Sequence, residues 1–225
     1  AFSAEALVRW RHPTKGILSP GVFVPILEKS NYISKLDKYV ISKTCKYMQK
    51  WFKELPDKNI KISVNLSRND LLIEGFPDKL AEVVRSHDIP LSALHMEVTE
   101  SAYIDNPERL IKQINNLRDK GFFVEMDDFG AGFSSLNTLK DINVDKLKLD
   151  MKFLSGDNTD KKGKIIIASI IKMAKALGLP IIAEGVETKE QADMLLDFGC
   201  SQMQGYYFSK PIPASEYEKI LYGNK

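Results

Sequence analysis

The chain alternates short apolar runs with amphipathic segments of helical length along nearly its whole extent, an order typical of a parallel α/β fold. The apolar runs predict seven strands, at residues 2–8, 61–66, 94–98, 122–127, 144–149, 180–184 and 202–206. The segments between them predict helices at residues 20–30, 34–55, 76–87, 107–120, 161–177 and 189–198. Gly121, Gly178 and Gly199 directly follow three of these helices, where a left-handed closing residue is favoured.

Seven strands are one fewer than a (β/α)8 barrel requires, and the chain begins inside its first apolar run. We therefore expect an α/β fold, a TIM-type (β/α)8 barrel that lacks its N-terminal strand in this chain. A length of 225 residues suits one hydrophobic core, and no segment reads as a long linker. Residues 1–225 are accordingly interpreted as a single, N-terminally truncated domain.

The overall composition argues against several classes of partner. The chain has 32 basic and 30 acidic residues, so its net charge of +2 gives no field that would attract DNA or RNA. Its two cysteines, Cys45 and Cys200, stand in helix-like or apolar sequence and are expected to be reduced. Since no apolar run reaches the roughly eighteen residues of a membrane span, we expect a soluble, cytoplasmic segment, although a longer parent protein could carry a membrane anchor.

Acidic and amide side chains stand where the predicted strands end. Asp127 and Asp128 close one apolar run and precede the glycine-rich and serine-rich stretch 129–135. One Asp could simply cap the following helical segment. Similar polar residues stand at or near the ends of other runs, however, at Asn65, Glu97, Glu100, Lys148 and Glu184, and Glu5 interrupts the first run. Ligands of α/β barrels bind at the carboxyl ends of the strands, and buried charge is costly unless it is paired or metal-bound, so this set predicts a metal site.

Seven short motifs occur in order across nearly the whole chain. They are Glu5-Ala6-Leu7-Val8-Arg9-Trp10, Val64-Asn65-Leu66-Ser67, Glu97-Val98-Thr99-Glu100, Asp127-Asp128-Phe129-Gly130, Lys148-Leu149-Asp150, Glu184-Gly185-Val186-Glu187 and Gln204-Gly205-Tyr206. Together they closely resemble the EAL family of bacterial cyclic di-GMP phosphodiesterases. The resemblance implies a hydrolase of bacterial signalling that cleaves one phosphodiester bond of cyclic di-GMP to give linear pGpG.

The resemblance also implies two divalent cations, Mg²⁺ or Mn²⁺. One ion would be held by Glu5, Asn65, Glu97 and Asp127, and Asp127 would bridge to a second ion held by Asp128 and Glu184. Hard oxygen donors suit these metals, and no cluster of His or Cys competes for zinc. Ca²⁺ is expected to inhibit, because its longer bonds and higher ligand number place the bridging water poorly.

Lys148, Glu184 and Glu187 are the expected catalytic residues. In the family, Lys148 would contact the nucleophilic water and the phosphate. A lysine at a strand end could also form a Schiff base, but the surrounding acids keep the amine protonated and poorly nucleophilic. Glu184 could be a metal ligand or, with a single ion, the general base. Glu187 could instead sit in the first turn of the helix after Thr188.

The remaining predicted residues would bind the substrate or anchor a loop. Arg9 and Gln204 are expected to bind substrate, Arg9 by a bidentate contact to phosphate, although Gln204 could also be an exposed amide. Glu100 is expected to anchor the loop 129–139, which in the family links the metal site to a dimer interface. Alternatively, Glu100 caps the next turn.

The expected partners are cyclic di-GMP, a second copy of the chain in a homodimer, and a sensory or GGDEF domain fused upstream. Two other functions stay open. The chain could be a catalytically inactive cyclic di-GMP receptor, although every expected ligand is present. It could also be an aldolase-type barrel enzyme that works through Lys148.

Overall fold

The computed structural model describes residues 2–103, 107–130, 136–151 and 161–223. The chain divides into two compact units, of which the first comprises residues 1–98 and 106–123 and the second residues 99–105 and 124–225. Each unit combines parallel strands with helices, which confirms the predicted α/β class. In these ranges no helix is both long enough and apolar enough to cross a membrane.

The first unit is built on three parallel strands, β1 (Phe2–Glu5), β4 (Ile60–Asn65) and β5 (Leu94–Thr99), with β4 paired to both of the others. Parallel strands covered on both faces read as continuous apolar runs rather than alternating ones. Accordingly, Leu94 and Met96 of β5 are fully buried, and so are Ile60 and Val64 of β4. Each strand ends in the polar residues considered below.

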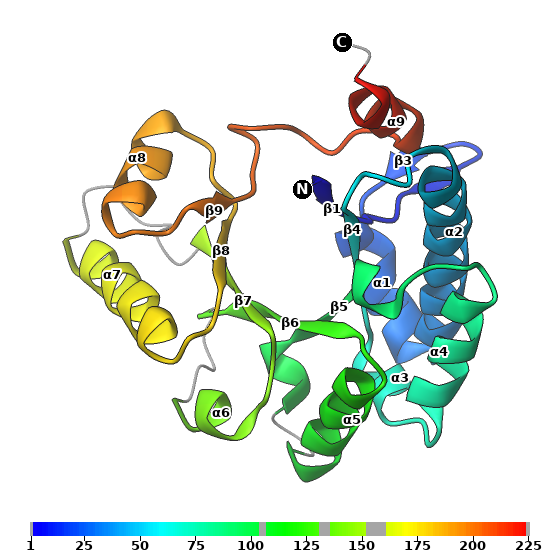
Figure 1. The fold of residues 1–225 in the computed structure, drawn as a ribbon, viewed down its shortest axis with the longest axis horizontal. Helices are drawn as coiled ribbons and strands as arrows, with labels where there is room; N and C mark the ends of the chain where they lie inside the picture. The colour runs from blue at the N-terminus through cyan, green and yellow to red at the C-terminus, as the bar shows by residue number, and fades with distance from the viewer. Residues whose placement is uncertain (1, 104–106, 131–135, 152–160, 224–225) are drawn as a thin grey trace. The chain divides into compact units, whose positions relative to one another are not determined.

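Helices α1 (Pro20–Lys29), α2 (Ile33–Glu54), α3 (Arg68–Leu71), α4 (Phe76–Arg85) and α5 (Pro107–Asp119) complete the first unit. In Figure 1, α1, α2 and α4 lie beside β4. The 22-residue helix α2 packs on β4 because Ile41, Cys45 and Met48 recur at helical spacing and are buried. A short hairpin of β2 (Trp10–His12) and β3 (Gly16–Leu18) precedes α1, and a 3₁₀ turn, η1 (Leu91–Ala93), precedes β5.

The second unit contains the parallel strands β6 (Phe123–Phe129), β7 (Lys146–Asp150), β8 (Ile181–Glu184) and β9 (Gln202–Met203), paired in that order. Its helices are η2 (Glu100–Tyr103), α6 (Leu136–Asp141), α7 (Lys161–Ala176), α8 (Lys189–Asp197) and α9 (Ala214–Tyr222). Figure 1 shows α7 and α8 beside β8. Ile167, Ile171 and Ala174 are buried on the face of α7 that packs toward β8.

Several predicted boundaries differ from the structure. The first strand ends at Glu5 rather than at residue 8, and the last ends at Met203, ahead of a turn at residues 206–208. The β2–β3 hairpin and α9 were not predicted. Gly121, Gly178 and Gly199 all have positive φ, which confirms the predicted helix ends. Of the predicted loop 129–139, residues 131–135 lie outside the described part of the chain.

Candidate active site

The end of β6 carries a bulge at its two adjacent aspartates. The register of β6 against β7 shifts between Met126 and Phe129, so Asp127 and Asp128 together stand opposite Lys148. Asp128 has a φ of 54°, a left-handed conformation that costs a non-glycine residue roughly 1–2 kcal/mol. Its backbone N–H donates to Asp127 Oδ1 over 2.8 Å. The bulge ends β6 with a buried carboxylate at Asp127 and an exposed one at Asp128.

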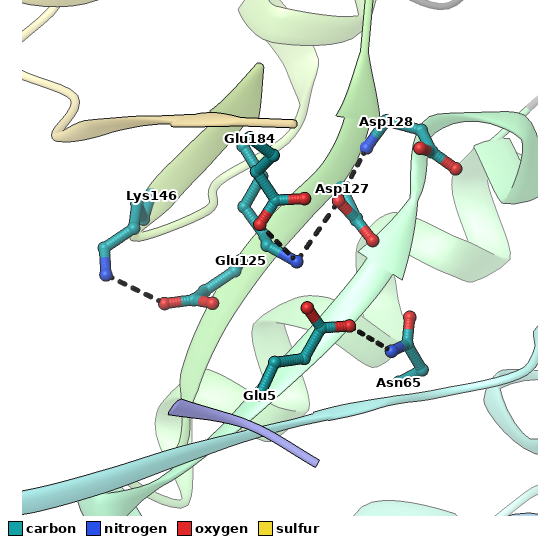
Figure 2. A network of polar contacts seen from close by, with 8 residues as sticks. Glu5, Asn65, Glu125, Asp127, Asp128, Lys146 and Glu184 are labelled. Atoms are coloured by element: carbon teal, nitrogen blue, oxygen red, sulfur yellow. Dashed lines mark hydrogen bonds and ion pairs between the residues drawn. The ribbon is translucent and has the colours of Figure 1, made fainter. Parts of the chain in front are cut away.

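Lys148 joins two of the strand ends in the second unit. Its side chain is almost completely buried, and its ammonium Nζ lies 3.3 Å from Asp127 Oδ1 and 3.0 Å from Glu184 Oε1. Figure 2 shows these two contacts as converging dashed lines between the labelled carboxylates of Asp127 and Glu184. Two carboxylates at this distance favour the charged form of the amine. A charged ammonium can stabilise a phosphate but is a poor Schiff-base nucleophile.

In the first unit, Glu5, Asn65 and Glu97 occupy the carboxyl ends of β1, β4 and β5. Asn65 Nδ2 donates to Glu5 Oε1 over 3.0 Å (Figure 2). Asn65 and Glu97 are register partners in the parallel pair β4–β5, and Glu97 is only 1 % exposed. The structure therefore brings together these three predicted ligands within their own unit.

Glu100 begins η2, directly after β5. It is buried, and its Oε2 accepts a hydrogen bond from the backbone N–H of Gly130 over 3.4 Å. At the other end of η2, the hydroxyl of Tyr103 donates to Asp141 Oδ2 over 3.5 Å. The single turn η2 thus contacts the chain on both sides of residues 131–135, as a loop anchor would.

The other predicted residues lie at the rim. Arg9 is exposed, and its guanidinium donates to the carbonyl of its neighbour Val8 over 2.9 Å. The backbone of Gln204 bonds to both Ala183 and Val186, and its side chain is half-buried. Glu187 is exposed one residue before Thr188, the N-cap of α8, and its backbone N–H donates to the side chain of Gln191.

A buried carboxyl pair lies behind the turn that follows Asn65. Asp37 of α2 accepts a hydrogen bond from the backbone N–H of Ser67 over 3.1 Å, and Asp70 of α3 is completely buried. Burial raises the pKa of Asp37 to about 6, and the charge of Asp70 raises it further against the hydrogen bond from Ser67. Burial also raises the pKa of Asp70, although Ser34 and Lys38 oppose the shift. The pKa of Asp37 therefore lies only about one unit below neutral pH.

Asp150 and the pair Glu125–Lys146 also lie in this region and were not predicted from the sequence. Asp150 stands in register with Glu184 at the ends of β7 and β8, and the motif Lys148-Leu149-Asp150 already offered a strand-end acid as a signal. Glu125 and Lys146 form an ion pair of 3.0 Å inside the sheet. A charged residue between Val124 and Met126 of an apolar strand was the available sign.

The donor chemistry of the strand ends fits a hard divalent cation. The candidates are carboxylates and one amide, all oxygen donors, and Glu97 and Asp127 are buried where an unpaired charge would be costly. Within the described ranges, no three His, Cys, Asp or Glu side chains come close enough together to form a metal-binding group. Between Asp127 and Glu184 the positive charge is supplied by Lys148.

Comparison with known proteins gives a consistent result. A family model described as "EAL domain" matches residues 1–211. The bifunctional diguanylate cyclase/cyclic di-GMP phosphodiesterase MucR of Pseudomonas aeruginosa is 34% identical over 215 residues, which are 96% of this chain and 31% of MucR. The cyclic di-GMP phosphodiesterase NbdA of the same species is 34% identical over 217 residues, 96% of this chain and 28% of NbdA.

A solved structure of the PaMucR phosphodiesterase in complex with c-di-GMP matches with a TM-score of 0.88 and 33% identity. The match covers 95% of this chain and 86% of that one, which confirms the predicted fold class. The chain spans only between a quarter and about a third of the length of the curated relatives that it matches.

Proposed function

Since the chain belongs to the EAL domain family, we propose that it is a metal-dependent phosphodiesterase that hydrolyses cyclic di-GMP to linear pGpG. The observation that carries this proposal is the buried Lys148 ammonium, 3.3 Å from Asp127 and 3.0 Å from Glu184 beside the β6 bulge. A fixed cation among strand-end carboxylates suits a reaction in which negative charge develops on phosphate oxygens. MucR and NbdA, which carry this activity in their names, match over 96% of the chain.

Metal ligation is assigned to oxygen donors in both units. The ligands in the first unit would be Glu5, Asn65 and Glu97, and those in the second Asp127, Asp128 and Glu184. Mg²⁺ and Mn²⁺ are the preferred ions because every donor is a hard oxygen. When bound, such ions supply a water of lowered pKa and offset charge on the phosphate.

The remaining predicted residues would bind the substrate, place the attacking water or support the loop after Asp128. Lys148 would contact the substrate phosphate and the attacking water, held in place by its two carboxylate partners. Arg9 would contact a second phosphate from the rim, where its exposed guanidinium donates to the neighbouring carbonyl of Val8. Gln204 would line the pocket from the end of β9, and Glu187 would assist catalysis from the loop before α8. Glu100 would steady the segment after Asp128 through Gly130.

The same contacts favour one rival function. Lys148 already neutralises Asp127 and Glu184, so these carboxylates need no metal to remain buried. A chain in which this ion pair persists would bind cyclic di-GMP without cleaving it and would act as a receptor. The presence of every expected oxygen donor favours the enzyme.

The wider setting of the domain is also a proposal. The matched segment is only 31% of MucR and 28% of NbdA, so we propose that residues 1–225 act as a single catalytic domain of a multidomain signalling protein. A homodimer of this domain and a sensory or GGDEF domain upstream would then control turnover.

One experiment separates enzyme from receptor. Cyclic di-GMP is incubated with the protein in Mg²⁺, in Mn²⁺ and in chelator, and the products are separated by chromatography while binding is measured by calorimetry. The enzyme predicts pGpG in both metals and none in chelator. Binding without pGpG in any condition would identify the receptor, and the absence of both would reject cyclic di-GMP as the ligand.

A further inference from the structure

A second ion pair lies inside the sheet, beside the one that contains Lys148. Lys146 Nζ is 3.0 Å from Glu125 Oε1, and the two side chains are 12% and 3% exposed. Figure 2 shows this pair next to the carboxylates of Asp127 and Glu184. Charged side chains buried this deeply in a strand are uncommon unless each is paired.

The ion pairs Glu125–Lys146 and Asp127–Lys148 both join β6 to β7, two residues apart along each strand. Glu125 and Lys146 are register partners in β6 and β7. Because every second residue of a strand faces the same side, Asp127 and Lys148 lie on that face one level toward the carboxyl end. The Glu125–Lys146 pair therefore stands directly before the bulge, on the same face of the sheet as the Asp127–Lys148 pair.

The start of β7 is held to β6 at this level. The carboxylate of Asp145 accepts a hydrogen bond from the backbone N–H of Val124 over 2.9 Å, and the N–H of Asp145 donates to the carbonyl of Val124 over 2.8 Å. Glu125 and Lys146 follow immediately. A bulge tolerates register slippage unless the regular pairs beside it are fixed, so these contacts determine where the extra residue falls.

The Glu125–Lys146 pair also keeps the Lys146 charge away from the carboxylates of Asp127 and Glu184. Without Glu125, the largely buried Lys146 ammonium would lose its carboxylate partner at 3.0 Å, and its long flexible side chain could then turn toward the carboxylates of Asp127 and Glu184. It would then compete with Lys148 for Asp127 or Glu184.

We propose that Glu125 and Lys146 are positioning residues for the reaction. Their ion pair fixes the β6–β7 register below the bulge and retains the Lys146 charge, so that Lys148 alone bridges Asp127 and Glu184. The expected effect on turnover rests on the proposed function, whereas the expected effect on the β6 bulge does not.

The test is a double-mutant cycle with Glu125→Gln, Lys146→Met and the double variant, which removes both charges and keeps most of the volume. Ile171→Val, in the buried face of α7, controls for a general loss of stability. Three properties are measured on each protein: Mn²⁺ affinity by calorimetry, amide hydrogen exchange of residues 126–129, and kcat and KM for cyclic di-GMP.

We expect Glu125→Gln to weaken Mn²⁺ binding and lower kcat about tenfold, as loss of a supporting partner does at metal sites, with KM changed by less than about threefold. Exchange of residues 126–129 should accelerate. The double variant should recover Mn²⁺ affinity to near wild type, because the Lys146 charge that competes with Lys148 is also gone. Its exchange of residues 126–129 should stay accelerated, because the ion pair that fixes the register is still absent. Ile171→Val should leave all three unchanged.

A Glu125→Gln protein with wild-type affinity and exchange would overturn the inference, and so would a double variant that binds Mn²⁺ as weakly as the single variant. If Glu125→Gln does not fold, Lys146→Met and the double variant test the register effect, since both lack the ion pair and should exchange residues 126–129 faster than wild type; wild-type exchange in both would overturn the inference. If the wild type neither binds Mn²⁺ nor cleaves cyclic di-GMP, the proposed function fails, and the exchange data alone decide whether the pair holds the bulge.

Discussion

Glu184 at the end of β8 holds the buried ammonium of Lys148 at 3.0 Å. Lys148 therefore has two opposite effects in the proposed enzyme. It stabilises negative charge on a substrate phosphate, and it repels a second cation from the carboxylates that it contacts. Substitution of this one residue separates the two effects.

Lys148→Met should lower turnover about a hundredfold, because the charge that stabilises the transition state is lost. The same variant should bind Mn²⁺ at least as tightly as wild type, since the repulsion has been removed. Steady-state kinetics and calorimetry test both parts, with Lys172→Met on the exposed face of α7 as the control. Turnover within about threefold of wild type would remove Lys148 from the chemistry.

Glu100→Ala should reduce turnover while Mn²⁺ affinity stays unchanged. The variant loses the acceptor for the Gly130 N–H, a buried hydrogen bond worth about 1–3 kcal/mol. Glu100→Gln is the matched control, because its amide oxygen can still accept this bond. Turnover, melting temperature and Mn²⁺ affinity are measured together, and full activity in the Ala variant would show that the loop after Asp128 needs no such anchor.

The carboxyl pair of Asp37 and Asp70 predicts a pH dependence of stability. Burial raises the pKa of Asp37 from 3.8 to about 6 and also raises that of Asp70, so the folded state binds more protons than the unfolded chain in this range. The free energy of unfolding therefore falls as pH rises from about 4 through 6, by roughly 3 kcal/mol for the Asp37 shift.

Asp70→Asn should flatten this dependence, because an amide carries no charge and can donate to the Asp37 carboxylate. Its melting temperature near pH 8 should rise by roughly 4 °C, with little change near pH 5. Thermal unfolding across pH is the measurement, and Asp57→Asn in an exposed turn is the control. An unchanged slope in Asp70→Asn would mean that the pair does not titrate on unfolding.

Ca²⁺ should bind the strand-end carboxylates yet fail to support hydrolysis. It accepts longer bonds and more ligands than Mg²⁺, so the attacking water is poorly placed. Increasing Ca²⁺ at fixed Mg²⁺ should therefore inhibit competitively with Mg²⁺. Equal rates in the two metals would contradict this account of the site.

Strong local patterns made most of the fold predictable. The strands β4 to β8 were located to within about two residues, because each is an apolar run between two amphipathic segments. The β2–β3 hairpin was missed because each strand has three residues and no alternation. Helix α9 was missed because Pro211 and Pro213 stand just before it and mark a loop.

The sequence predicted which polar residues stand at the strand ends, but it did not predict which side chains they contact. Parallel strands put Lys148 and Glu184 at one edge of the sheet, whereas their distance of 3.0 Å depends on side-chain packing. The bulge at Asp127 and Asp128 was not predicted, since a register shift depends on the partner strand. Glu125 was overlooked because a charge in an apolar strand has meaning only once Lys146 is known to lie opposite.

The most direct test of the central claim compares the turnover of Asp127→Asn with that of wild type. Both proteins are prepared free of metal, Mg²⁺ is restored, and pGpG formation from cyclic di-GMP is measured, with Asp78→Asn on the exposed surface as the matched control. Asp127→Asn should lose activity by about a thousandfold while keeping its fold and melting temperature, and Asp78→Asn should match wild type. Turnover of Asp127→Asn within about tenfold of wild type would contradict a metal-dependent phosphodiesterase centred on the β6 bulge.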